Sequence, residues 1–409
     1  MKVLISGASV AGPVLAYWLT RYGFEVTVVE RAPTLRKTGG HAVDLFRPAV
    51  DIAEKMGVLD QVRARKTGTE LLTFHVPGRS RPVGMQVGKL ITAFSDRHVE
   101  IMRDDLSEIF YDAGRDDAEY VFGDSITAIA EDGEVAFERG PSRRFDLVIG
   151  ADGLHSNVRR LVFGPEERFA TWIGAYLAVL SVPDYLGLEG RMEGVSAIDR
   201  IVGLYSAAHL PDARAVFLFR TREPLDYHYR DVPRQKELLR EHFADLGWEV
   251  PRLLAELGTT PAFYFDSITQ LRMDTWSRGR VTLVGDAGYC PGPAVGGSTS
   301  LAVVGAYVLA GELAAAGGDP ARAFPAYEAE IGAYVRGSRK LALGMARRLV
   351  PRGRFDLWAL VQAARVLRRI PDPLIRAAGR LGGGSTRLHD AVTLKDYSRY
   401  ETARGAAPR

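Results

Sequence analysis

The first thirty residues alternate short apolar runs with one glycine-rich turn. An apolar run over residues 3–5 is followed by the turn Gly7 to Gly12 and then by apolar positions at helical spacing over residues 13–22. A second apolar run covers residues 25–29. Period and length together predict strand, tight turn, helix and strand, in that order.

This order is typical of a βαβ dinucleotide-binding unit. Its glycines let the backbone approach a pyrophosphate at the helix N-terminus, and an acid about 20 residues further on binds ribose hydroxyls. Gly7, Ser9 and Gly12 form the turn here, and Glu30 followed by Arg31 ends the second strand. Ser9 stands where the motif usually has its middle glycine. The alternative interpretation is a tight turn in some other α/β protein.

Two further buried-strand patterns each end in an aspartate turn. Residues 145–150 lead into Asp152 and a helix that opens at Ser156, and residues 279–284 lead into Asp286. In a doubly wound sheet, ligands bind at the carboxyl ends of the strands, so both aspartates are candidates for cofactor hydroxyls. A loop precedes the next helix, expected over Leu301 to Leu313, and it supplies further candidates: Pro293, Gly296, Gly297, Ser298 and Thr299.

Between residues 171 and 268 the pattern changes to strand-like runs, over 175–182, 201–205 and 215–220, with one helix over 233–243. Alternating aromatic and apolar positions predict a sheet with one face toward a core. We expect one face to line a cavity, because binding pockets are mostly apolar with few polar anchors. The candidate pocket residues are His41, Tyr205, Phe217, Phe219 and Arg220.

Composition narrows the class of protein. The chain has 409 residues, 46% hydrophobic and 25% charged, with a formal net charge of +3, which excludes disorder and gives no reason to expect nucleic-acid binding. The single cysteine, Cys290, cannot form an internal disulfide, so we expect a cytoplasmic location. We expect no signal peptide, no membrane span and, without CxxC or HExxH motifs, no metal site.

The segment from Arg336 to Arg380 is strongly basic, with twelve Arg and Lys against two Asp and Glu. We expect helices with breaks near Pro351 and near Pro371 and Pro373, because proline disfavours continuation of a helix. A solvated helical face packed on an acidic body is one interpretation. A surface for an anionic cofactor, lipid or partner is the other.

Four motifs, taken in order, resemble the class A FAD-dependent monooxygenases of the para-hydroxybenzoate hydroxylase type. They are the glycine turn followed by Glu30-Arg31, the RxxL segment Arg103 to Leu106, Asp152-Gly153, and Gly285-Asp286-Ala287. Residues 39–45, which include Gly40, also look like a loop of the tetracycline-inactivating members. Where the family usually has a histidine and a GxGxN run, this chain has Tyr289 and residues 296–300.

The resemblance implies an α/β fold with a Rossmann-like FAD-binding domain, an inserted sheet-rich substrate domain and C-terminal helices. It implies FAD-binding parts at 1–74, 98–170 and 269–335, substrate-domain parts at 75–97 and 171–268, and basic helices with a tail at 336–409. It also implies noncovalent FAD and NADPH or NADH as a transient reductant. A flavin C4a-hydroperoxide would transfer one oxygen atom of O2 to a hydrophobic, aromatic or polyketide-like small molecule.

Hydroxylation is the first expectation, and Baeyer–Villiger insertion would use the same intermediate. Two other functions remain open at this point: a flavin-dependent reductase or dehydrogenase on the same fold, and a non-catalytic flavin- or ligand-binding protein. We expect a monomer or homodimer. The cofactor carries the chemistry in this family, so no acid–base dyad is expected in the sequence.

Overall fold

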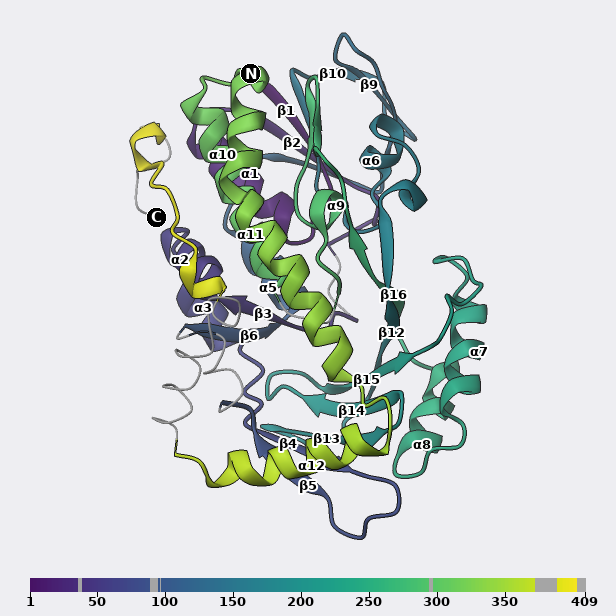
Figure 1. Ribbon diagram of the computed structural model, residues 1–409. Helices are drawn as coiled ribbons and strands as arrows, with labels where there is room; N and C mark the ends of the chain where they lie inside the picture. Colours follow the sequence, from purple (N-terminus) through teal and green to yellow (C-terminus); the bar gives the residue numbers. More distant parts are fainter. Residues whose placement is uncertain (36–38, 89–94, 96, 294–296, 372–387, 403–409) are drawn as a thin grey trace.

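The computed structural model describes residues 1–35, 39–88, 95, 97–293, 297–371 and 388–402. At the N-terminus, a six-stranded sheet has the order β17-β18-β11-β1-β2-β7 and is parallel except at the β17–β18 edge (Figure 1). Its central strands are buried on both faces, which explains their unbroken apolar runs. The bounds are Lys2–Ser6 (β1), Glu25–Glu30 (β2), Glu119–Phe122 (β7), Leu147–Gly150 (β11), Ser277–Arg278 (β17) and Val281–Leu283 (β18).

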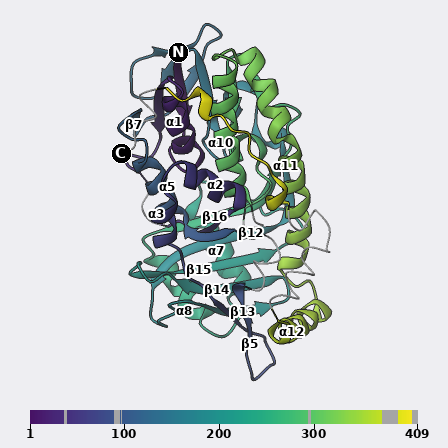
Figure 2. The ribbon, with the colours of Figure 1, turned by 90° about the vertical axis from the view of Figure 1, so that its left-hand side faces the viewer.

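Two long helices pack beside this sheet. Helix α10 (Ser298–Ala315) is apolar on nearly every side, and α11 (Pro320–Leu349) runs antiparallel to it and reaches the second sheet (Figure 2). By length and composition α10 could cross a membrane, but 78% of it is buried inside the fold, as in the core helix of a soluble protein. The all-round burial explains why α10 lacks the polar face of a surface helix.

The second sheet has seven strands in the order β16-β12-β15-β14-β13-β4-β5. Three of its strands form an antiparallel meander, and β12 pairs on both sides, with β15 and β16. Helices α7 and α8 cover its outer face, and the C-terminal half of α11 packs on its inner face. The bounds are Leu71–His75 (β4), Val83–Gln86 (β5), Ala170–Pro183 (β12), Arg191–Ala197 (β13), Arg200–Ser206 (β14), Asp212–Arg220 (β15), Phe263–Leu271 (β16), Val232–Phe243 (α7) and Val250–Ala255 (α8).

We propose the division into an FAD-binding and a substrate domain that the sequence predicts, and we compare its boundaries with the ends of the strands. The seven-stranded sheet begins at Leu71, four residues before the expected boundary, because β4 pairs in parallel with β13. It ends at Leu271 rather than residue 268. The helix expected over Leu301 to Leu313 extends at both ends, to Ser298 and Ala315.

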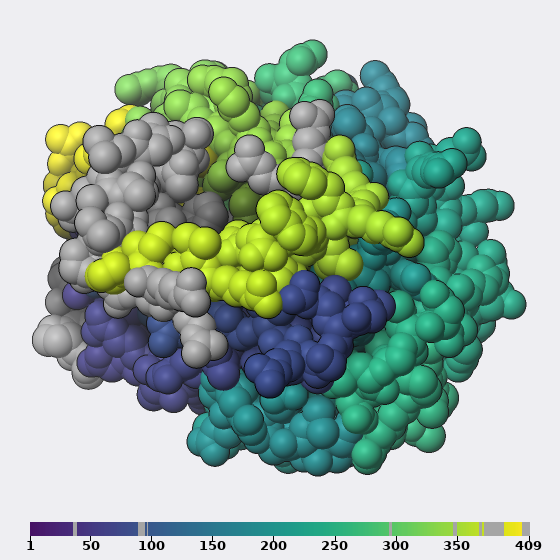
Figure 3. Space-filling view, turned by 60° about the horizontal axis from the view of Figure 1, so that its bottom comes forward, coloured from purple at the N-terminus to yellow at the C-terminus, as the bar shows by residue number. Residues whose placement is uncertain are grey.

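The basic segment is helical as far as the structure describes it. Helix α11 ends at Leu349 and α12 begins at Arg354, which places the break at the expected Pro351. Helix α12 ends at Arg369; Pro373 lies outside the described residues. Figure 3 shows α12 lying across the molecule beside the segment that holds β4 and β5, which it contacts through β5.

The remaining elements complete the frame around the two sheets. A two-stranded sheet of β3 and β6 lies between them, and a three-stranded sheet of β8, β9 and β10 flanks the first. The bounds are Ala42–Phe46 (β3), His98–Met102 (β6), Ile126–Ile129 (β8), Glu134–Phe137 (β9), Arg143–Arg144 (β10), Ala11–Arg21 (α1), Arg47–Lys55 (α2), Leu59–Ala64 (α3), Arg103–Asp112 (α5), Asn157–Val162 (α6), Asp286–Tyr289 (α9) and Arg354–Arg369 (α12), with short 3₁₀ turns at Glu166–Arg168, Glu256–Gly258, His389–Ala391 and Ser398–Tyr400.

Candidate active site

The glycine turn forms a close-packed cradle between β1 and α1. Gly7 has φ +107°, and a Cβ there would lie 2.5 Å from the carbonyl oxygen of Ala151. A Cβ on Gly12 would lie 1.9 Å from the carbonyl oxygen of Gly7. No side chain caps the N-terminus of α1, and its first turn contains no acid. The free N–H groups and the positive end of the helix dipole fit a pyrophosphate.

Arg103 joins this turn to the loop that precedes β3. Its Nη2 donates to Ser9 Oγ over 3.0 Å, and its backbone N–H donates to the carbonyl oxygen of His41 over 3.0 Å. Ser107, one turn along α5, donates to the carbonyl oxygen of Ser9 over 2.9 Å. Ser9 therefore orders the turn through its hydroxyl and its carbonyl. The guanidinium adds positive charge beside the N-terminus of α1.

Glu30 lies where β2 ends, next to the glycine turn. Its two carboxylate oxygens accept from the backbone N–H groups of Ala8, over 2.9 Å, and Ala32, over 2.8 Å. Each oxygen keeps a second lone pair, so the carboxylate can still accept from ribose hydroxyls. Arg31 is exposed beside it.

Asp152 is used differently from the expectation that it binds a cofactor hydroxyl. Its carboxylate accepts from Ser156 Oγ and from the backbone N–H groups of Asn157 and Val158 at the start of α6. Burial raises its pKa, and these hydrogen bonds oppose the shift. The structure places Asp152 as a capping group of α6, so we remove it from the proposed cofactor contacts.

Asp286 begins α9 directly after Gly285, whose φ of +67° turns the chain out of β18. Ser298 Oγ donates to Asp286 Oδ1 over 2.5 Å. The positive φ at the start of α10 belongs to Gly297, at +87°, and Ser298 is the first residue of that helix rather than its cap. Among the described residues, no side chain caps α10, whose N-terminus therefore lies uncapped beside an acid.

The other candidates in this loop surround that N-terminus. A Cβ on Gly297 would lie 2.5 Å from the ring of His389, so only glycine fits there. Thr299 lies in the first turn of α10, and Pro293 is partly buried before it. Gly296 lies outside the described residues. Tyr289, which stands where the family has histidine, is fully buried with its hydroxyl 2.9 Å from that of Tyr327, so it belongs to the core.

The loop before β3 connects the start of α5 to the seven-stranded sheet. The Gly40 N–H donates to Asp104 Oδ2 over 2.6 Å, and its carbonyl oxygen accepts from Arg214 Nε over 3.1 Å. A Cβ on Gly40 would lie 2.6 Å from the Asp104 carboxylate, so a larger residue there would displace that carboxylate. Burial, helped by the charge of Arg103, lowers the pKa of the adjacent His41 to about 4. His41 is therefore neutral at physiological pH.

The inner face of the seven-stranded sheet meets the loop through two tyrosines. Tyr205 Oη accepts from the backbone N–H of Ala42 over 2.7 Å. The ring of Tyr264 lies 5.7 Å from that of His41, and it is close enough to Arg103 and Asp286 to feel their charges. Burial raises the pKa of both tyrosines, so both phenols keep their protons.

Two of the other pocket candidates lie on the opposite face of the sheet, and the third contacts α11. Phe217 and Phe219 are fully buried on the outer face, in edge-to-face contact with Phe243 of α7, so they belong to the core and do not line a pocket. Arg220 points to the inner side but reaches the C-terminal end of α11, where its Nη1 donates to the carbonyl oxygen of Ala346 over 3.4 Å. The contacts of Phe217, Phe219 and Arg220 therefore do not support their expected place in the pocket.

Tyr264 and Arg214 are the site residues that the sequence analysis missed. In the strand Phe263–Leu271, alternation places Tyr264 on the face opposite Phe263 and Phe265, but it does not say which face meets the loop before β3. On β15, Arg214 alternates with buried Ala213 and was the available signal, because a charged side chain in an apolar strand needs a partner.

Residues 1–330 match the family described as FAD binding domain. A protein of uncharacterised function from Mycobacterium tuberculosis is 45% identical over 347 residues, covering 81% of this chain and 90% of its own length. A flavin-dependent monooxygenase of Legionella longbeachae is 40% identical over 346 residues, covering 84% and 88%. The crystal structure of the tetracycline destructase Tet(51) aligns with a TM-score of 0.82 and 33% identity, covering 97% and 99%.

Proposed function

This chain belongs to the FAD-binding family of flavoprotein monooxygenases, and from that premise we propose that it spends NADPH or NADH to transfer one atom of O2 to a hydrophobic, aromatic or polyketide-like small molecule. The observation that carries the substrate class is the inner face of the seven-stranded sheet. There Tyr205, Tyr264 and Arg214 reach the same loop that Arg103 ties to the glycine turn. Two tyrosines and one buried arginine therefore lie beside the residues that we propose to bind the cofactor.

The residues present fit both the adenosine end and the flavin end of FAD. We propose that the α1 N-terminus and Arg103 hold the pyrophosphate, that Glu30 holds the ribose, and that Asp286 with the α10 N-terminus holds the ribitol and the ring. When bound, FAD supplies the redox chemistry between the nicotinamide and O2.

The side chains around that place can orient a substrate and exclude water. Tyr205 and Tyr264 stay protonated and can donate hydrogen bonds to a carbonyl or phenolate oxygen. Neutral His41 can accept one without adding a charge. The Arg214 guanidinium is buried and paired with Asp212, so it orders Gly40 rather than neutralising a substrate.

The tetracycline destructases support a flat, polycyclic substrate, since the alignment with Tet(51) covers the substrate sheet as well as the FAD-binding unit. We propose a fused-ring phenol or enol as the class. Such a ring could lie against Tyr264, because offset stacking of aromatic rings is favourable.

Oxygen uptake by the holoenzyme tests the proposal. We expect O2 consumption that depends on NADPH or NADH and is stimulated by members of a panel of fused-ring phenols, with a product 16 Da heavier. Anaerobic turnover with an artificial electron acceptor and no oxygenated product would indicate a reductase or dehydrogenase. FAD that neither nucleotide reduces would contradict the enzymatic proposal altogether.

A further inference from the structure

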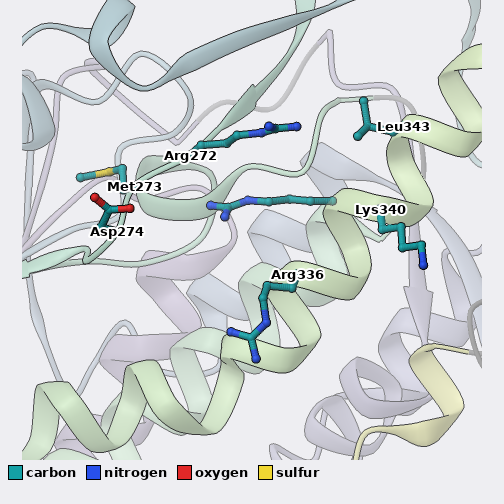
Figure 4. Close-up of a pocket in the computed structure, with 7 residues that line it drawn as sticks. Arg272, Met273, Asp274, Arg336, Lys340 and Leu343 are labelled. Carbon is teal, nitrogen blue, oxygen red and sulfur yellow. The ribbon is translucent and has the colours of Figure 1, made fainter.

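A basic pocket of about 370 Å³ lies where the end of β16 meets α11 (Figure 4). Arg272 comes from the chain just after β16, and Arg336 and Lys340 come from α11. The full lining is Arg272, Met273, Asp274, Arg336, Arg339, Lys340 and Leu343. The volume lies within the range of small-molecule sites.

The pocket has four cationic side chains and one carboxylate. Arg339 has its Nε and Nη2 atoms buried, and neither atom has a hydrogen-bond partner within the described part of the chain. The Arg272 Nη2 donates only to Gln270 Oε1, over 3.2 Å. Across the described residues, none of the four cations is in an ion pair. Buried donors without acceptors are costly, so this cluster is suited to an anion that enters from solvent.

Hydrogen bonds connect the pocket to the segment that follows Asp286, a residue that we propose to bind the flavin. The Leu271 N–H, one residue before Arg272, donates to the carbonyl oxygen of Cys290 over 2.9 Å. Cys290 is four residues from Asp286. Gln270 Nε2 donates to the carbonyl oxygen of Arg339 over 2.8 Å, which fixes α11 against the same strand. The pocket is therefore tied through β16 to the segment that follows Asp286.

We propose that this pocket binds the phosphate groups of the nicotinamide dinucleotide, an inference that rests on the proposed use of NADPH or NADH. Guanidinium groups bind phosphate oxygens in pairs of parallel hydrogen bonds, and the ammonium of Lys340 adds a further donor. The pyrophosphate of FAD does not need this pocket, because we propose that it binds at the N-terminus of α1. Arg272, Arg336 and Lys340 are exposed, which suits a ligand that binds and leaves in each cycle.

Calorimetric titration of the FAD-loaded protein with NADP⁺, NAD⁺ and inorganic pyrophosphate tests the pocket directly, without turnover. The test variant is Arg272→Gln with Arg336→Gln, which leaves the partly buried Arg339 in place. Arg322→Gln, an exposed arginine on the same helix outside the pocket, is the matched control. FAD content and unfolding midpoint establish that each variant is folded.

We expect the double variant to raise the Kd for the dinucleotides about tenfold or more, with the control within about twofold of the wild type. A larger loss for NADP⁺ than for NAD⁺ assigns the pocket to the 2′-phosphate, and an equal loss assigns it to the pyrophosphate; either supports the proposal. Unchanged dinucleotide affinities overturn it, even if affinity for inorganic pyrophosphate falls.

Anaerobic reduction of the wild-type flavin separates this proposal from the proposed function. If NADPH and NADH both fail to reduce it, the proposed function is wrong. If reduction proceeds and saturates at the same nucleotide concentration in the double variant, the proposed use of NADPH or NADH stands and the pocket assignment is wrong.

Discussion

The hydroxyl of Ser298 holds the Asp286 carboxylate and so joins the start of α10 to the end of β18. We expect Asp286→Ala to weaken FAD binding by about 1–3 kcal/mol, a rise in Kd of about fivefold to 150-fold, because a charged hydrogen bond to the cofactor is lost. Ser298→Ala should have a smaller effect in the same direction, since the carboxylate remains but is less fixed. Flavin fluorescence titration of the apoprotein measures both.

Asp132→Ala removes a carboxylate from an exposed turn and serves as the control for that titration. A Kd for Asp286→Ala equal to that of Asp132→Ala would remove Asp286 from the cofactor site. Glu30→Ala should behave like Asp286→Ala, with an added loss of order in the glycine turn because Ala8 loses its acceptor.

His155 lies between two carboxylates, with Nδ1 3.0 Å from Glu166 and Nε2 3.0 Å from Asp266. Burial disfavours the charged ring, but the two hydrogen-bonded acids outweigh it and raise the pKa to about 9. A folded-state pKa above the ordinary value of about 6.5 means that the stabilisation is complete below pH 6.5 and is lost as pH rises toward 9.

We therefore expect the free energy of unfolding to fall by about 2 kcal/mol between pH 6.5 and 9, after allowance for the quarter of the His155 side chain that is exposed. In His155→Gln this alkaline decline should flatten, whereas in the exposed control His228→Gln it should persist. Urea denaturation across that pH range measures it. An equal decline in all three proteins would contradict the assignment.

At the scale of elements, α10 depends on a glycine facing α9. A Cβ on Gly305 would lie 1.9 Å from the hydroxyl oxygen of Tyr289, in a fully buried contact. We expect Gly305→Ala to destabilise the protein by about 1–3 kcal/mol through overpacking. Adding Tyr289→Phe removes the clashing oxygen and should restore part of that loss, as measured by urea denaturation.

Gly344→Ala is the control for this comparison, because Gly344 lies in α11 with no atom within 4 Å of its added Cβ. There the alanine should stabilise the protein by about 0.5–1 kcal/mol, as expected for a helix interior. If Gly305→Ala proved as favourable as Gly344→Ala, the packing between α9 and α10 would be wrong.

The periodicity of apolar residues predicted the position of helices and strands better than it predicted which face of a strand points toward the cofactor. The βαβ unit and α10 followed from local apolar runs and from the glycines at their ends, since those signals lie within one segment. In β15 both faces are apolar, because α7 covers one and α11 the other. Alternation shows that Phe217 and Leu218 point in opposite directions, but only tertiary packing decides which of them faces the cofactor.

The site shows the same limit. Glu30, Arg103 and Asp286 could be predicted as cofactor contacts because their motifs have a fixed place relative to the strands. Tyr264 and Arg214 belong to no such motif, and they meet His41 and Gly40 only through contacts more than 150 residues apart. For Asp152 the sequence cannot distinguish a capping aspartate from a ligand-binding aspartate, because both occupy the same place after a strand.

For the whole molecule, α11 runs from α10 beside the first sheet to the second sheet, and α12 follows it along β5. Both helices are rich in arginine. Val361 and Ala364 are buried on the inner side of α12, which packs on β5. Phe355, Trp358 and Val366 of the same helix are exposed, so a membrane contact through this face has to be tested. We expect the holoenzyme not to co-float with vesicles that contain anionic lipid, because Val361 and Ala364, which would have to insert with them, are already buried in the fold. Salt-sensitive co-flotation would show instead that the basic helices form a membrane surface.

The most direct test of the central claim, oxygen transfer by an NAD(P)H-dependent flavoenzyme, is to follow the oxygen atoms. The holoenzyme is incubated with NADPH or NADH and a fused-ring phenol that stimulates oxygen uptake, under ¹⁸O₂, and the product is analysed by mass spectrometry. We predict a product 18 Da heavier than the substrate, with one labelled atom. A product that carries oxygen from water, or one oxidised without any added oxygen, would contradict the claim.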